Sequence, residues 1–164
     1  MTRGRTFASA AVVLGATVSL AAAAEPLKLE VAKPVTLRCE TQAILIKDGG
    51  PAPTKGKLEL RLEVKTSSPE MSGAWSPVSA DDAHKNAFAN MQKTACASGC
   101  PMTVSAAGDA QIWAPAPKSL DKLAAEEALL LAVIKADALS LKASRFRGQA
   151  IEALESGTCA VAPQ

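Results

Sequence analysis

The sequence predicts an α+β fold: a small antiparallel, sandwich-like β-sheet flanked by two or three short helices and stapled by disulfides. Three observations support this prediction. Residues 56–65, GKLELRLEVK, alternate between apolar and charged side chains, as in a strand with one solvated face. Residues 80–96 place apolar side chains on one helical stripe. Four cysteines follow an export signal, and an even number of cysteines in an oxidising compartment indicates disulfides.

The first 24 residues have the pattern of a cleavable signal peptide. Arg3 and Arg5 precede an apolar run over residues 8–20, and small residues lead up to a cleavage point after Ala24. We therefore expect one exported domain, residues 25–164, in the periplasm or secreted. The signal holds two of the 18 basic residues and none of the 16 acidic ones, so the remaining chain is formally neutral. A neutral chain without basic clusters disfavours nucleic acids and anionic membrane surfaces as partners.

The predicted elements before residue 119 are strands and one helix. Residues 35–47 form a first strand that ends at Asp48-Gly49-Gly50-Pro51, and residues 56–65 form the second. Ser79 and Asp82 have the spacing of a capping box at the start of the helix over 80–96. Two short strands, PMTVSA and AQIWAP, surround the turn at residues 107–109.

The segment 119–146 is ambiguous. Its Ala, Leu, Glu and Lys content favours one long helix, whereas ALLLAVIK followed by ALSLKAS indicates a hairpin that turns near Ala136-Asp137. The alternation of Leu139 and Leu141 with Ser140 and Lys142 favours a short helix over 119–126 followed by two strands. Residues 150–155 are then predicted to form a last helical turn before Gly157.

The cysteines allow three pairings, of which proximity favours Cys96 with Cys100 and therefore Cys39 with Cys159. The long loop closed by the second pair corresponds to about 4 to 5 kcal/mol in the chain-entropy model. The spacing CASGC differs from the Cys-x-x-Cys of redox exchange, and the pair follows a helix whose C-terminal dipole disfavours a thiolate. We therefore expect both pairs to be structural disulfides.

The residues CASGCP, 96–101, resemble the copper-site motif of the Sco family of thioredoxin-fold metallochaperones. The resemblance implies a copper site at Cys96 and Cys100, which Met102 could complete as a soft ligand. It covers about six residues, and the family's ligand His lies downstream of its cysteines, whereas the only His here, His84, lies upstream. No cofactor is therefore expected, and a copper-binding or redox protein is the alternative.

Two tryptophans share a local pattern, because Trp75 and Trp113 each stand two residues before a Pro. They are either core residues or exposed rings that stack on a glycan or a Pro-rich peptide. The residues MSGAW, 71–75, resemble the Ser-Gly motif of C-type lysozyme inhibitors, which implies an inhibitor of an envelope-directed hydrolase. The motif in that family continues to a Tyr, and this chain has none.

Catalytic patterns are weak in this sequence. A Ser-His-Asp or Cys-His site would need His84 as its base, and no serine lies in a nucleophile-elbow pattern. No phosphate-binding loop, zinc spacing or calcium loop is present. The sequence therefore predicts a non-catalytic exported protein that binds another envelope protein or a glycan, with Trp75 and Trp113 as the candidate contact residues.

Overall fold

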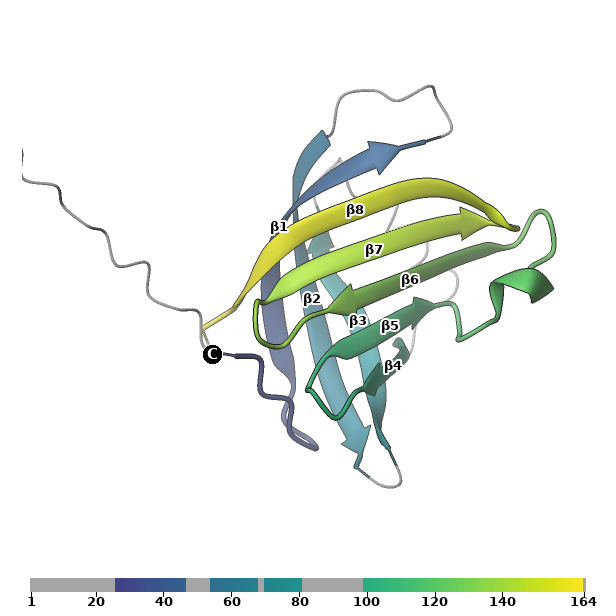
Figure 1. The fold of residues 1–164 in the computed structure, drawn as a ribbon. Helices are drawn as coiled ribbons and strands as arrows, with labels where there is room; N and C mark the ends of the chain where they lie inside the picture. Colours follow the sequence, from purple (N-terminus) through teal and green to yellow (C-terminus); the bar gives the residue numbers. More distant parts are fainter. Residues whose placement is uncertain (1–25, 47–53, 68–69, 81–98, 164) are drawn as a thin grey trace, which may run out of the picture.

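The chain folds into an all-β closed barrel. The computed structural model describes residues 26–46, 54–67, 70–80 and 99–163. In this part of the chain eight antiparallel strands follow one another around the sheet in sequence order, and β1 also pairs with β8 (Figure 1). The described residues contain no α-helix, so the predicted α+β fold with flanking helices is wrong.

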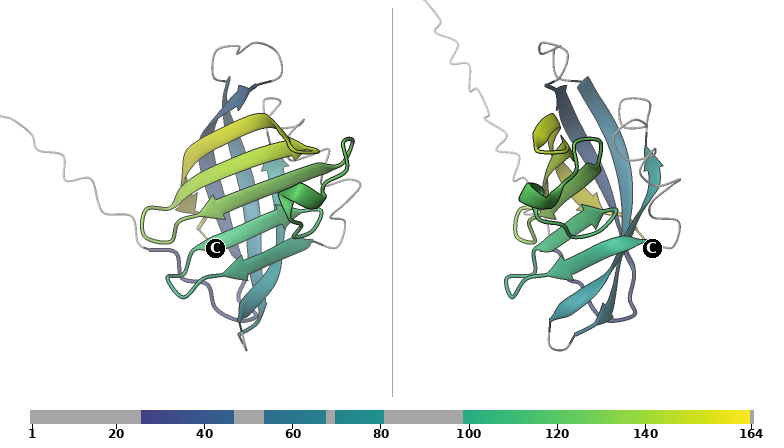
Figure 2. Two further views of the ribbon diagram at one scale, coloured as in Figure 1. Left: turned by 45° about the vertical axis from the view of Figure 1, so that its right-hand side comes forward. Right: turned by 90° about the vertical axis from the view of Figure 1, so that its right-hand side faces the viewer.

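The strands differ in length around the barrel. In the left view of Figure 2, the green and yellow strands β5–β8 lie in front of the blue strands β1–β3 and cross their direction. A single 3₁₀ turn, η2, lies between β5 and β6. The bounds are β1 Val35–Leu45, β2 Thr54–Thr66, β3 Met71–Ala80, β4 Cys100–Val104, β5 Ala110–Ala114, η2 Leu120–Lys122, β6 Ala128–Ile134, β7 Ser140–Arg147 and β8 Ala150–Val161.

Several sequence predictions are confirmed and others corrected. The structure confirms the first two predicted strands as β1 and β2. It also confirms the two strands around residues 107–109 as β4 and β5, and the hairpin in 119–146 as β6 and β7. The helix predicted over 119–126 is wrong, since only the three residues of η2 form a 3₁₀ turn there. The helical turn at 150–155 is the start of β8, because pairing with both β7 and β1 satisfies its backbone as a strand and outweighs its helical composition.

The strand β3 was not predicted. Ser79, expected as a helix cap, lies in β3, and its hydroxyl donates to Glu59 Oε2 at 3.3 Å. The rest of the predicted helix, residues 81–96, lies outside the described residues. A Gly, a Pro and small residues give 71–80 a weak strand signal, so its pairing with β2 and β4 decides its structure.

Most side chains in the barrel interior are apolar, and the buried polar residues in the described part of the chain are Thr41, Glu152 and Glu155. Alternate residues of each strand point inward, as predicted for Leu58, Leu60, Leu62 and Val64 of β2, while the charged residues between them face outward. An eight-stranded barrel is just wide enough for its side chains to fill. The large inward side chains with almost no exposure come from seven strands: Leu37, Leu60, Leu62, Trp75, Met102, Ile112, Leu130, Ile134 and Leu141.

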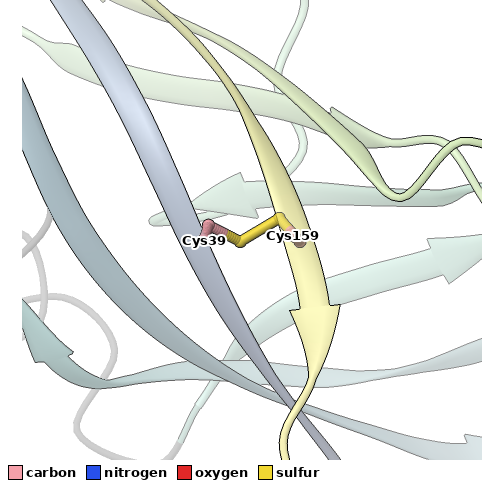
Figure 3. The surroundings of a disulfide bond; sticks show 2 residues. All are labelled: Cys39 and Cys159. Carbon is pink, nitrogen blue, oxygen red and sulfur yellow. A yellow bond between two sulfur atoms is a disulfide. The ribbon is translucent and has the colours of Figure 1, made fainter. Parts of the chain in front are cut away.

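A disulfide joins the two strands that close the barrel. Cys39 of β1 and Cys159 of β8 are direct partners in the antiparallel register, and both are buried (Figure 3). The predicted pairing of these two cysteines is confirmed. Because they are 120 residues apart, the bond links the first strand of the barrel to the last.

One end of the barrel is covered by the segment before β1. Leu27, which is buried, belongs to the core cluster, and its N–H donates to the carbonyl of Ala136 at 2.8 Å. The N–H of Ala32 donates to the carbonyl of Val64 at 3.0 Å, next to a bridge between Val31 and Val64. These bonds hold the segment across the ends of β2 and the β6–β7 turn.

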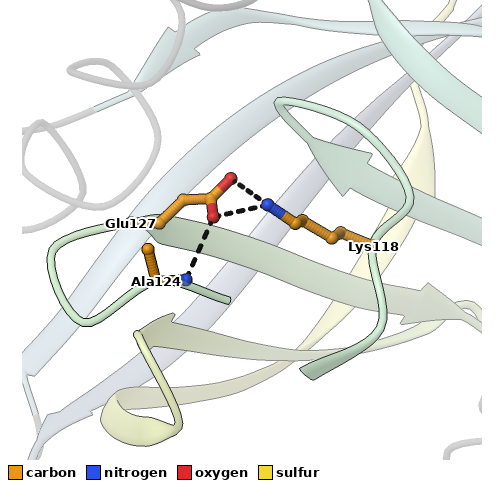
Figure 4. A network of polar contacts seen from close by, with 3 residues as sticks. All are labelled: Lys118, Ala124 and Glu127. Atoms are coloured by element: carbon orange, nitrogen blue, oxygen red, sulfur yellow. Dashed lines mark hydrogen bonds and ion pairs between the residues drawn. The ribbon is translucent and has the colours of Figure 1, made fainter. Parts of the chain in front are cut away.

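A smaller apolar cluster lies on the outside of the barrel. The connection from β5 to β6 carries Leu123 onto the outward side chains of Leu129 and Phe146, with Trp113 and Leu131 packed beside them. Figure 4 shows the polar contacts that hold this connection: Lys118 Nζ lies 2.8 and 2.6 Å from the two carboxylate oxygens of Glu127. The same carboxylate accepts the N–H of Ala124 at 3.2 Å.

Candidate binding cleft

The two tryptophans do not form a pair of exposed rings. Trp75 of β3 points into the barrel and is 2% exposed, whereas Trp113 of β5 is half-buried in the outer cluster around Leu123. The indole Nε1–H of Trp75 donates to the backbone carbonyl of Trp113 at 2.8 Å. The ring of Trp75 therefore serves as core in this structure and offers no exposed face for stacking.

The candidate soft-metal residues also lie in the interior. Cys100 and Met102 are alternate residues of β4, and both point inward with 1% exposure. Cys100 is disulfide-bonded, so its sulfur is not available as a thiolate ligand in this oxidised form. Cys96, its predicted partner and the third residue of the alternative copper site, lies outside the described residues.

An open cleft of about 1010 Å³ lies across β4–β7 and is also lined by Leu29, Ser67, Glu70 and Met71, which come from the segment before β1 and from around the β2–β3 turn. Its floor contains one cross-strand row of side chains: Thr103 of β4 pairs with Gln111 of β5, Gln111 pairs with Val133 of β6, and Val133 pairs with Lys142 of β7. Residues that pair directly across antiparallel strands share a face. The four side chains thus present hydroxyl, amide, methyl and ammonium groups on one surface.

The β4–β5 turn forms one wall of the cleft, and hydrogen bonds within the turn pair its backbone groups. Gly108 has φ +86°, a left-handed conformation that suits glycine, and its N–H donates to the carbonyl of Ser105 at 2.9 Å. The N–H of Asp109 donates to the hydroxyl of Ser105 at 3.2 Å. These hydrogen bonds, all between residues of the turn itself, fix its conformation.

An ion pair ties this turn to the β6–β7 turn. Asp109 accepts the ammonium of Lys135 at 2.6 Å and the backbone N–H of Ala136 at 3.0 Å. The hydrogen bond from Lys135 is the main cause that holds the pKa of Asp109 below its ordinary value, and Asp109 in turn raises the pKa of Lys135. Both groups are therefore charged at neutral pH and largely neutralise each other, which leaves Lys142 as a separate positive charge.

A second groove of about 600 Å³ lies on the outside of β2, β1 and β8. Its lining is polar and includes Lys55 of β2, Gln42 of β1 and Ser156 of β8. Lys57 and Glu40, on the same groove, form a long ion pair of 3.9 Å with both side chains mostly exposed. An exposed pair at this distance contributes little to stability.

The described residues offer no built metal centre: no three His, Cys, Asp or Glu side chains among them gather to hold an ion. In the same part of the chain, no helix has the length and apolar character needed to cross a bilayer. The two grooves supply hydrogen-bond donors and acceptors, charged groups of both signs and a few apolar side chains, which can recognise a partner by local contacts.

Comparison with known proteins gives no relative: no family model matches the chain, and no curated protein or solved structure matches it either. The resemblances of CASGCP and MSGAW to known families therefore rest on those few residues alone. MSGAW forms the first half of β3, where Gly73 and Trp75 are alternate residues and Trp75 points into the core.

Sequence reasoning missed the residues of both grooves. The sequence did contain a signal for the larger cleft, because Thr103, Gln111 and Lys142 are polar, outward positions of strands that the sequence predicts. Alternation does not say which strands are neighbours. The order of the strands around the barrel, which brings these positions into one row, was needed to find the cleft.

Proposed function

We propose that this chain is an exported, non-catalytic binding protein that recognises another envelope protein through the cleft on the outside of β4–β7. The observation that carries the proposal is the combination of a filled interior with an open outer cleft of about 1010 Å³. An eight-stranded barrel holds a small ligand when its interior is left open. Here large apolar side chains occupy the interior, so recognition takes place on the outer wall.

Export is supported by two independent features. Residues 1–24 carry the charge and hydrophobicity pattern of a signal peptide. The disulfide between Cys39 and Cys159 is of the kind that persists in oxidising compartments such as the periplasm. The chain without residues 1–24 is formally neutral, which favours a partner recognised by local contacts over one attracted by a long-range field.

A protein partner is favoured over a glycan by the lining of the cleft. Glycan sites commonly use exposed aromatic rings, and among the described residues that line the cleft none is aromatic. The floor instead offers Thr103, Gln111 and Lys142, whose hydroxyl, amide and ammonium groups match the polar groups of a peptide backbone and acidic side chains. The half-buried Val133 between them adds an apolar contact.

Site-specific photo-crosslinking in intact cells tests the proposal. A photoreactive residue at Gln111 should give a light-dependent protein adduct, whereas the same residue at Arg61, an exposed outward position of β2, should not. Mass spectrometry would identify the adduct. Equal adducts from both positions, or none from Gln111, would contradict a binding role for the cleft.

Cell fractionation tests the export step separately. The mature protein should be found in the periplasm or the medium, and sequencing of its N-terminus should begin at Glu25. A cytoplasmic protein that retains Met1 would contradict the proposal whatever the crosslinking result.

A further inference from the structure

The two outer grooves are joined by one row of side chains. Lys55 of β2 pairs with Gln42 of β1, Gln42 pairs with Ser156 of β8, and Ser156 pairs with Lys142 of β7. All four residues are exposed. The first three line the smaller groove and Lys142 lines the larger cleft, so the pairing of Ser156 with Lys142 makes the two depressions neighbours. We call these four residues the lysine row.

Two glycines and a buried threonine lie among the residues that line the smaller groove. Gly56 and Gly157 both pair with the buried Thr41 of β1, at inward positions of β2 and β8. A Cβ on Gly157 would lie 2.3 Å from the carbonyl oxygen of Glu40 and 2.6 Å from Thr41 Cγ2, which no real side chain tolerates. Glycine therefore lets β8 pack closely against β1 beneath the groove.

The ends of the lysine row carry its charge. Among the residues that the structure describes, neither Lys55 nor Lys142 has an acidic partner, in contrast to Lys57 and Lys135, which pair with Glu40 and Asp109. Between the two lysines stand the neutral side chains of Gln42 and Ser156. The row is thus two cations separated by an amide and a hydroxyl, both of which donate and accept hydrogen bonds.

We propose that the lysine row binds an extended acidic segment of the partner protein, with two carboxylate side chains about four residues apart. Three interstrand spacings separate Lys55 from Lys142, about 14 Å along the sheet surface. An extended peptide rises about 3.3 Å per residue, so side chains at positions i and i+4 lie on one face about 13 Å apart. Each carboxylate meets one ammonium, and Gln42 and Ser156 hydrogen-bond the peptide backbone between them.

This inference rests on the proposed function, because it names the chemistry of the protein that the outer surface recognises. It adds a feature that the cleft alone does not give, namely the spacing of the charges. An acidic oligosaccharide would also meet the two lysines, but it lacks the 3.3 Å repeat that sets the distance between carboxylates in a peptide strand.

Fluorescence anisotropy with synthetic peptides tests the charge spacing. The probe is a labelled ten-residue peptide of serine, threonine and alanine with two glutamates four positions apart, added to the purified oxidised protein at low salt. We expect it to bind, and we expect a peptide of the same composition with adjacent glutamates to bind about fivefold more weakly. Equal binding of the two peptides, or no binding of either, overturns the proposal.

Charge reversal locates the site on the protein. Lys55→Glu and Lys142→Glu should each weaken binding of the spaced peptide about fivefold or more, whereas Lys65→Glu should change it less than twofold. Lys65 is the matched control, since it is an exposed lysine at the far end of β2, about 33 Å from Lys55. Thermal unfolding of each variant checks that the barrel is intact. An equal loss in Lys65→Glu would show attraction by overall charge and overturns the proposal.

Two further outcomes separate this inference from the proposed function. An oligogalacturonate of similar length and charge that binds more tightly than the peptide would show a glycan site and overturn the acidic-peptide assignment. The Gln111 adduct should also be measured in the Lys142→Glu variant. If the adduct is as strong as without that substitution, the lysine row is overturned while the cleft is supported. If Gln111 gives no adduct and the spaced peptide does not bind, both the proposed function and the lysine row are overturned.

Discussion

The seam between β1 and β8 and the short strands β4 and β5 hold the barrel in different ways. On the seam, pairing runs without a break from Leu37 to Leu45 of β1, and a disulfide crosses it. Between β4 and β5 the pairing covers only Met102 to Val104, and each strand has five residues. The β1–β8 ladder is therefore three times as long as the β4–β5 ladder, although β4 and β5 also pair over five residues each with β3 and β6.

The two regions also differ in what they contribute to the proposed binding surface. The short strands carry the floor and wall of the cleft, and they are supported from inside by Trp75 and from outside by the cluster around Leu123. Sites that must adapt to a partner are commonly found on the less strongly held parts of a fold. In the proposed function, the cleft beside β4 and β5 contacts the partner, and the lysine row extends that surface across the seam through Gln42 and Ser156.

Removing the disulfide is expected to have the largest effect. In the double variant Cys39→Ala and Cys159→Ala, loss of a bond that closes a loop over 120 residues should lower the free energy of unfolding by about 4 to 5 kcal/mol. Equilibrium unfolding in urea measures it. A loss below about 1 kcal/mol would mean that the long ladder alone holds the seam, and the contrast between the two regions would fail.

Truncating the outer cluster should have an intermediate effect on the other region. Leu123→Ala removes a buried side chain from its contact with Leu129 and Phe146 and should cost about 2 kcal/mol, near the low end for a buried Leu, because the site is close to the surface. Limited proteolysis should then cut within residues 115–127. Leu120→Ala, in the same turn but exposed, is the matched control and should cost less than about 0.5 kcal/mol.

The ion pair beside that cluster should give the smallest effect, and it depends on pH. The hydrogen bond from Lys118 is the main cause that lowers the pKa of Glu127 in the folded protein below its ordinary value of 4.5. The contribution of Glu127 to stability is therefore present at neutral pH and is lost as the pH falls through this lowered pKa. Carboxyl NMR titration should show the pKa of Glu127 rising in Lys118→Met, and an unchanged pKa would refute the pairing.

The sequence predicted the strands better than it predicted the fold. Alternation identified β2 and β7, and it decided for the β6–β7 hairpin against the long helix that composition favoured, because one face of each of these strands is buried and the other is exposed to solvent. It failed for β8, whose residues Ala150 to Glu155 are good helix formers. Their structure is decided by β1 and β7 on either side, and such long-range pairing is not visible in a local pattern.

The candidate site was harder to predict than the strands. Tryptophan and cysteine stand out in a sequence, yet Trp75 and Cys100 proved to be interior residues, with Cys100 in a disulfide. Threonine, glutamine and lysine on the outside of strands look like ordinary solvated positions. Thr103, Gln111 and Lys142 become a possible site only through the closure of the barrel and the turn at Ser105 that stands over them.

The pairing of the first strand with the last sets the order in which this protein can mature. β1 lacks its second neighbour until the twelve residues of β8 have left the ribosome or the translocation channel. Up to that moment the sheet cannot close and would have two open edges. A chain shortened by its last strand would therefore be expected to expose these edges and aggregate.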